Sequence, residues 1–417
     1  MTSIVKRCDK TGRHTPEARP AKGRSKGAGR PGLGTSRNNV AGQVSPGFDP
    51  STLRLLRFAR RQISARWLIA ASRRDQGLAP YVDGVTAKDP GWVRPPRAAR
   101  CSWRVAADVG VHLDEEARRA HYSGTERCGS VWACPVCSSV IRGRRAEEIA
   151  VGYRQAAANG WGGFMLTLTV RHQKVLSLEE SLDGLISAWG RLLRRKPWQR
   201  LRQRVWIVGY VRSVEITHGE SGWHPHLHIW LVTGSQINDS QDVAEIQAEL
   251  AALWQDTVRR GKSGNIVPDI EHGCRLEPAT TAGVAGYLAK VQEEGKGLAS
   301  EIARGDWKEG HNGSLLPFQL LDWLDSRAES LWVEYVNTTR GRRAIVWSKG
   351  LRDLLQVGDE KTDQEIIDET DAAPHVFSVE GAVYDQLRRN PQHLADVLTE
   401  TEEDAVIAAT RWGKSPP

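Results

Sequence analysis

The sequence predicts an α+β fold in which an antiparallel sheet carries helices on one face. Between residues 164 and 292 the hydrophobic pattern runs strand, helix, strand, strand, helix, strand, helix. That order is typical of a split βαβ, or ferredoxin-like, sheet. Within it, the run Trp223–Trp230 has histidines at alternate positions. On a strand they would all point to one face of the sheet.

Charge is unevenly distributed along the 417 residues. The net charge is +8, but residues 1–50 carry ten Lys/Arg against three Asp/Glu, and residues 355–417 carry five against fourteen. A basic tail and a basic middle indicate a polyanionic partner such as nucleic acid. The chain has no apolar run of about 18 residues and no apolar signal core, so we expect no membrane partner and a cytoplasmic location.

Composition and pattern divide the chain into six predicted segments. They are a disordered basic tail at 1–48, a basic helix and linker at 49–100, a zinc-binding segment with a basic helix at 101–158, the sheet domain at 159–295, a basic extension of that domain at 296–356, and an acidic, mainly helical C-terminal region at 357–417.

The predicted elements follow from hydrophobic periodicity. The basic helix at 51–74 is equally consistent with contact to a phosphate backbone and with an ordinary amphipathic role. The other predicted elements are helices at 141–158, 178–193, 239–262, 282–292, 317–332 and 380–412, and strands at 164–170, 205–217, 223–233, 266–270 and 341–350.

Four of the six cysteines fall within a short stretch, as Cys101, Cys128, Cys134 and Cys137. The Cys-x2-Cys spacing places two thiolates on one turn, as a tetrahedral zinc ion needs. A redox pair is the alternative, but no thioredoxin-like pattern surrounds these residues. The sequence therefore predicts a structural zinc site with these four ligands.

The turn at 218–222 makes strands 205–217 and 223–233 a hairpin. If the hairpin is centred between Glu220 and Ser221, Glu215 lies opposite His226, on the face that also holds His224 and His228. A carboxylate and imidazoles with open positions are typical of a catalytic metal. A shift of one residue would move Glu215 to the other face.

A second candidate group lies on the helix predicted at 282–292. Tyr287 and Lys290 are three residues apart and share a helix face. A phenol is a possible covalent nucleophile, and a nearby ammonium favours its phenolate form. By itself this pair is more often a core residue followed by a surface residue.

Three motifs in this order resemble the HUH endonucleases, and more closely the replication initiator (Rep) proteins of rolling-circle plasmids. They are Leu166–Thr169, His224–His228 and Tyr287–Lys290, and the cysteine cluster resembles the region ahead of the first motif in that group. The resemblance covers roughly residues 101–356. It implies an HUH-type nickase domain at 159–295.

The resemblance also implies a mechanism and partners. His226 and His228 would bind Mg²⁺ or Mn²⁺. The hairpin geometry, not the resemblance, adds Glu215 as third ligand, and His224 on the same face could replace it. Tyr287, helped by Lys290, would nick plasmid origin DNA that is single-stranded at the nick. A 5′-phosphotyrosine link and a 3′-OH primer would result, for use by a host helicase and polymerase.

One position departs from the pattern, because Gly283 stands where some relatives have a glutamate thought to activate water at termination.

Three alternatives stay open: an HUH relaxase or transposase, a zinc-containing DNA-binding regulator without catalysis, and metal-dependent hydrolysis without a covalent step. Relaxases often place the tyrosine before the histidine motif, whereas Tyr287 follows it.

Overall fold

The structure, a computed structural model, describes residues 50–79, 94–171, 173–237, 239–261, 266–279, 314–369 and 373–413. All of them belong to one unit of the chain, Pro46–Pro417. The tail predicted at 1–48 and the helix predicted at 282–292 lie outside these ranges. No helix in the described ranges is long and apolar enough to cross a membrane.

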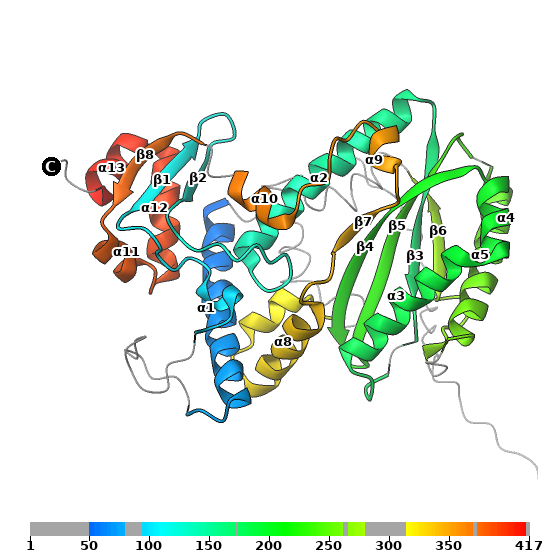
Figure 1. The fold of residues 1–417 in the computed structure, drawn as a ribbon, viewed down its shortest axis with the longest axis horizontal. Coiled ribbons are helices and arrows are strands. Elements are labelled where there is room, and N and C mark those ends of the chain that lie inside the picture. Colours follow the sequence, from blue (N-terminus) through cyan, green and yellow to red (C-terminus); the bar gives the residue numbers. More distant parts are fainter. Residues whose placement is uncertain are drawn as a thin grey trace, which may run out of the picture. The chain divides into compact units, whose positions relative to one another are not determined.

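The main sheet has five strands, and every neighbouring pair is antiparallel (Figure 1). Its order is β6-β3-β5-β4-β7. The strands are β3 (Gly162–Thr169), β4 (Ile207–Gly219), β5 (Gly222–Thr233), β6 (Cys274–Pro278) and β7 (Ile345–Trp347). The mixed α+β class expected from the sequence is confirmed.

The hairpin formed by β4 and β5 has the predicted register. Glu215 pairs with His226, and Gly219 pairs with Gly222 across the turn. Gly222 has a φ of +91°, a backbone conformation that glycine adopts without the strain other residues would meet.

Helices cover both faces of the main sheet, so the prediction of helices on one face is wrong. On one face, α3 (Leu178–Arg194) and α5 (Ser240–Arg259) share a core with apolar strand residues such as Leu166, Leu227 and Ile229 (Figure 1). On the other face, α2 (Pro135–Ala158) and α9 (Leu351–Leu354) pack against Trp230 and Val232. α2 and α9 thus cover one end of β5, and the histidines lie further along β5 on the same face.

A second sheet joins two distant parts of the chain. It has the order β2-β1-β8, with β1 (Val109–Asp114) in the middle, β2 (Arg119–Tyr122) and β8 (His375–Val379). Figure 1 shows the cyan β1 and β2 beside the orange β8. Its core includes α12 (Pro391–Glu403), and α11 (Gly381–Leu387) and α13 (Ala405–Trp412) contribute to it. These strands were missed because they are short and their histidines and glycine obscure the alternation.

The long helices match the prediction. The helices expected at 51–74, 178–193 and 239–262 are α1 (Pro50–Asp75), α3 and α5. The helix expected at 141–158 begins earlier, at Pro135 of α2. The segment expected as one helix at 317–332 is instead a 3-10 turn, η3 (Pro317–Asp322), followed by α8 (Ser326–Thr339). The remaining elements are η1 (Arg97–Arg100), α4 (Lys196–Arg204) and α10 (Asp363–Glu369).

The strand predicted at 266–270 is wrong. Pro268 has no N–H to donate to a strand ladder. The carbonyl of Ile266 accepts a hydrogen bond from the Arg171 amide, and the Ile266 side chain is buried. The strand that completes this edge of the sheet is β6, several residues later, where Leu276 pairs with Leu166.

A buried ion-pair network attaches α2 to the chain around α9. Glu148 Oε2 lies 3.2 Å from Arg145 Nη1 and 3.0 Å from Arg352 Nη1, and Arg145 also contacts Asp363 at 3.1 Å. Removing one partner of a buried pair leaves the other charges uncompensated.

We therefore expect Glu148→Ala to lower the free energy of unfolding by about 3–5 kcal/mol, measured by denaturant titration. The control is Glu147→Ala, since Glu147 is more than half exposed and pairs only with Arg144 in the described part of the chain. It should change stability by about 0.5 kcal/mol or less. Equal effects of the two substitutions would contradict this account of the network.

Candidate functional site

The strand β5 presents three histidines on the face opposite α3 and α5. His224, His226 and His228 alternate with Leu227 and Ile229, which are fully buried in the core on the other side. The rings of His224 and His226 have centroids 4.1 Å apart, and those of His226 and His228 lie 6.0 Å apart and nearly parallel. The three side chains thus form a row along the strand.

Neighbouring strands supply hydrogen-bond partners for this row. Thr169 Oγ1 lies 3.0 Å from His224 Nε2, and Thr167 Oγ1 lies 3.1 Å from His228 Nδ1. Glu215 Oε2 lies 2.6 Å from His228 Nε2. Both threonines lie in the motif Leu166–Thr169, but the sequence alone assigned them no role. Their signal was the alternation with buried leucines, which places them on the histidine face.

The histidines and Glu215 are not gathered as closely as ligands around a metal. Within the described residues, these four side chains do not form a group whose ligand atoms all lie within 4.8 Å of one another. Instead, the Glu215 carboxylate is hydrogen-bonded to His228 Nε2, the ring nitrogen that faces it. His228 is buried, whereas the side chain of Glu215 is 37% exposed, so this edge of the cluster opens to solvent.

Arg275 is a further residue on this face. Arg275 pairs with Thr167 of β3, and Thr167 pairs on its other side with His228 of β5. Its side chain is 71% exposed and contacts Glu277 at 2.6 Å. Arg275 was not predicted, because the edge strand was expected at 266–270 rather than at β6.

The predicted nucleophile and its helper, Tyr287 and Lys290, lie outside the described residues, as does Gly283. Their roles stay predictions.

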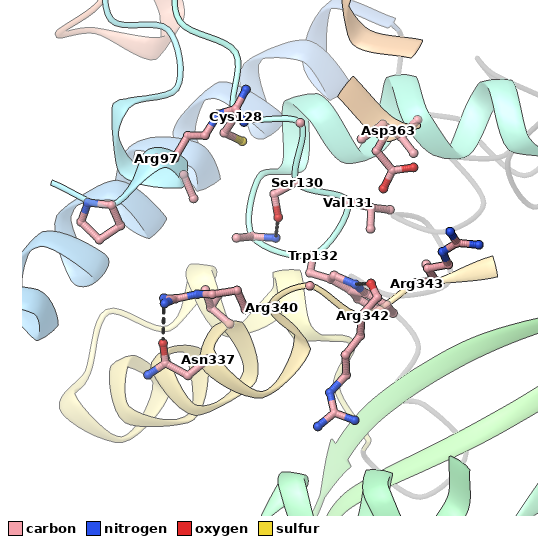
Figure 2. A pocket seen from close by; sticks show the side chains of 18 of the residues that line it. Arg97, Cys128, Ser130, Val131, Trp132, Asn337, Arg340, Arg342, Arg343 and Asp363 are labelled. Carbon is pink, nitrogen blue, oxygen red and sulfur yellow. Dashed lines mark hydrogen bonds between the residues drawn. The ribbon is translucent and has the colours of Figure 1, made fainter. Parts of the chain in front are cut away.

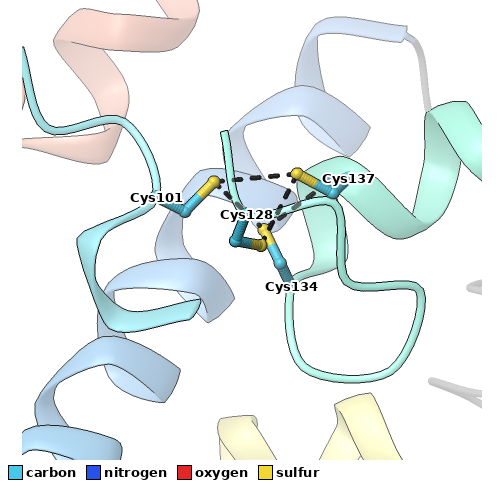
Figure 3. Close-up of side chains that lie close together, drawn as sticks. All are labelled: Cys101, Cys128, Cys134 and Cys137. Carbon is cyan, nitrogen blue, oxygen red and sulfur yellow. Dashed lines mark hydrogen bonds between the residues drawn. The ribbon is translucent and has the colours of Figure 1, made fainter. Parts of the chain in front are cut away.

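The four predicted zinc ligands come together in one buried cluster (Figure 3). The sulfur of Cys101 lies 3.7 Å from that of Cys137 and 3.6 Å from that of Cys134, and Cys128 lies 3.7 Å from Cys137. Sulfurs at about 2.3 Å from a tetrahedral zinc ion are about 3.8 Å apart. The thiols are free rather than bonded in disulfides. The cluster therefore has the spacing that a structural zinc site requires.

The surroundings favour a thiolate in this cluster. Hydrogen bonds from the other three thiols hold the pKa of Cys101 well below its usual value, and the Arg61 guanidinium adds to this effect. Cys134 is the N-cap of α2, and its sulfur accepts a hydrogen bond from the backbone N–H of Cys137. Cys274 lies elsewhere, on β6, where burial raises the pKa of its thiol to about 12.

Comparison with known proteins places this chain in a family. A family model for replication proteins matches residues 122–393, well over half of the chain. The chain belongs to the replication protein family. The matched range contains the histidine row and the position of Tyr287. It begins after Cys101 and extends into the acidic C-terminal region, so the resemblance reaches further than the expected limit at 356.

Named relatives of this replication protein come from several bacteria. A protein named "Protein rep" from Streptomyces lividans is 32% identical over 306 residues, which cover 59% of this chain and 67% of the relative. A "Neomycin resistance protein" from Streptomyces cyanogenus is 28% identical over 49% of the chain and 53% of its own length. A "Protein rep" from Streptococcus pneumoniae is 30% identical over 33% of the chain and 36% of its own length. The chain thus spans from about a third to two thirds of these relatives. No solved structure matches it significantly.

Proposed function

We propose that this replication protein initiates rolling-circle replication of a plasmid by nicking one strand of the origin. The observation that carries the proposal is the row of three histidines with Glu215 on one face of the sheet, in a chain of the replication protein family. The fold assignment forms part of the proposal. The strand order β6-β3-β5-β4, with α3 and α5 on one face, supports a split βαβ sheet of the HUH type.

We propose that His226, His228 and Glu215, with His224 beside them, hold a Mg²⁺ or Mn²⁺ ion. The Glu215 carboxylate is a donor that suits Mg²⁺ and Mn²⁺, and the imidazole nitrogens favour a transition metal such as Mn²⁺. A bound ion would draw these side chains closer together than they now lie. When bound, the cation supplies Lewis-acid polarisation of the scissile phosphate. Thr167 and Thr169 orient His228 and His224 through their hydrogen bonds. Such partners fix the tautomer and the direction of the ring.

Tyr287 is the proposed nucleophile. The described chain leaves the sheet at the β6 edge, where Pro278 pairs with Phe164, and returns beside β4, where Leu315 bridges to His218. In the proposed step the tyrosine oxygen bonds to phosphorus and loses its proton. The P–O3′ bond breaks, and the 3′ oxygen takes up a proton to become the 3′-OH primer. Lys290 favours the phenolate.

The zinc site has a structural role in this proposal. The four cysteines are 0–7% exposed, so a zinc ion among them has no open position for a substrate. A zinc ion would hold the loop that carries Cys128 and Cys134 against the start of α2, since closed four-thiolate sites contribute folding energy.

The partners follow from the proposed reaction. They are plasmid origin DNA, single-stranded at the nick, then a host helicase and polymerase that extend the 3′-OH, all in the cytoplasm. A relaxase or transposase would form the same covalent link, and only origin-dependent priming separates them from an initiator. A zinc-containing regulator would bind DNA without forming a link.

We expect Tyr287→Phe to abolish covalent complex formation, because phenylalanine has no oxygen to attack phosphorus. The measurement is a denaturing gel of full-length protein with labelled single-stranded origin DNA and Mn²⁺. The control is Tyr153→Phe, at a tyrosine on α2 whose hydroxyl donates to the Ala279 carbonyl at 3.5 Å and which has no role in the proposed reaction. A covalent band that survives in Tyr287→Phe would remove Tyr287 from this role. No band in any protein, with binding intact, would favour the regulator.

Thr167→Val should weaken Mn²⁺ binding about 10- to 100-fold, because the imidazole of His228 loses the partner that orients it. Mn²⁺ affinity is measured on the DNA-free protein by titration with detection of the free ion. Thr410→Val, at an exposed position on α13, is the matched control. Unchanged affinity in Thr167→Val would mean that the cation is bound elsewhere.

Cys134→Ser should reduce the zinc content from about one ion per chain to none and lower the thermal midpoint, because one of four thiolates is lost. Elemental analysis of purified protein measures the content. Cys274→Ala removes a buried thiol outside the cluster and should keep the zinc. A Cys134→Ser protein with full zinc content would rule out this ligand set.

A further inference from the structure

A cavity of about 910 Å³ lies beside the cysteine cluster, and Cys128 is one of its lining residues. None of the residues of the histidine row lines it. Its walls come from α1, the loop that holds Cys128 and Trp132, the start of α2, and the end of α8 with the residues that lead into β7 (Figure 2). The proposed nicking reaction assigns no role to this cavity.

The lining of this cavity is strongly basic. Eight of its residues are arginine or lysine, and three are aspartate or glutamate. Three of the arginines have a carboxylate partner: Arg145 contacts Asp363 at 3.1 Å, Arg343 contacts Glu360 at 3.6 Å, and Arg342 contacts Asp183 at 2.6 Å.

The other four lining arginines have no carboxylate partner in the described part of the chain. Arg97 donates to the Gln364 side-chain amide, and Arg340 donates to the Asn337 amide at 3.1 Å. Arg142 donates to the Ser138 hydroxyl and lies over the Trp132 ring. The fourth is Arg94, which is exposed. In Figure 2, Arg97 and Arg340 approach the cavity from different elements. Guanidinium groups without a carboxylate partner are suited to binding phosphate oxygens.

Apolar groups share the cavity with these arginines. Leu68, Val131, Val336 and Ile345 contribute to its walls. A single DNA strand presents both the phosphates that arginines bind and the flat faces of bases that apolar walls accept. A duplex hides its base faces by stacking, and an inorganic anion has none. The mixed lining therefore favours a single strand.

We propose that this cavity binds a short stretch of single-stranded DNA, with Arg142 and Arg340 contacting its phosphates. The inference rests on the proposed function, which acts on origin DNA that is single-stranded at the nick. It adds a binding site for that strand, separate from the histidine row and assembled from the cysteine-containing segment and α8.

The test compares two double variants of the full-length protein. Arg142→Gln/Arg340→Gln removes two cavity charges, whereas Arg154→Gln/Arg259→Gln removes two exposed charges outside the cavity, one of them on the same helix as Arg142. Binding of a fluorescent oligothymidine strand is measured by anisotropy at several salt concentrations, without added divalent cation. Circular dichroism melts verify folding.

We expect the cavity variant to bind the strand at least about tenfold more weakly at low salt, and the slope of log affinity against log salt to fall by about 1.4, or about 0.7 for each lost phosphate contact. The control variant should stay within about twofold of the wild type. Equal losses in both variants, or none in the cavity variant, would overturn the inference. So would competition by free dATP as strong as that by the strand, or tighter binding of the annealed duplex.

If the cavity variant does not fold, ultraviolet crosslinking of a bromodeoxyuridine strand to the wild-type protein replaces it. Crosslinked peptides should come from residues around 130–142 or 333–345, and crosslinks confined to other regions would overturn the inference. Covalent-complex formation is assayed separately with Mn²⁺. Strand binding lost in the variant while the wild type forms no covalent complex would support the cavity and refute nicking. Unchanged strand binding in the cavity variant, together with covalent-complex formation by the wild type, would refute the cavity site alone.

Discussion

The register of β5 between β3 and β4 is the constraint on which the candidate site depends. Leu227 and Ile229 are fully buried against α3 and α5. Each such side chain contributes about 1.5–3 kcal/mol through burial. A slip of one residue would place His226 and His228 in that core and expose both apolar side chains. The histidine row is therefore held in place by the apolar side chains on the opposite face of the sheet.

Helix α2 connects the cysteine cluster to the main sheet. Its first turn contains Cys137 and is capped by Cys134, and its later residue Ile149 packs with Trp230 on the histidine-bearing face. Between these ends lie Arg142, which lines the basic cavity, and Glu148, which anchors the helix to Arg352. One helix thus contributes residues to the cluster, to the cavity and to the core at one end of the sheet.

The sequence was informative where one strong period dominated. The apolar stripe of α3 and the alternation in β5 specify both element type and buried face, and symmetry about the turn specifies the pairing of Glu215 with His226. It failed where tertiary contacts decide. The pairing of β1 with β8 joins residues far apart in the chain, and no local pattern encodes it. In the run containing Pro268, local hydrophobicity suggested a strand, but the edge position beside β3 is taken by β6. The same distinction between local pattern and tertiary contact separates Glu215 from the threonines. Hairpin geometry predicted the carboxylate, but the hydroxyl partners needed the pairing of β3 with β5.

The two candidate metal centres differ in a way that burial explains. The four thiols are almost inaccessible, and in the described structure their sulfurs already have tetrahedral spacing. A cation there would have a closed shell, as in structural sites. Glu215, in contrast, reaches His228 from the solvent side and is more than a third exposed. Because a proton and a divalent cation compete for the same nitrogen–oxygen pair, a cation proposed there would have to displace the hydrogen bond between them. The proposed site would then keep positions open to solvent and to a phosphate, which a catalytic metal needs and a structural one does not.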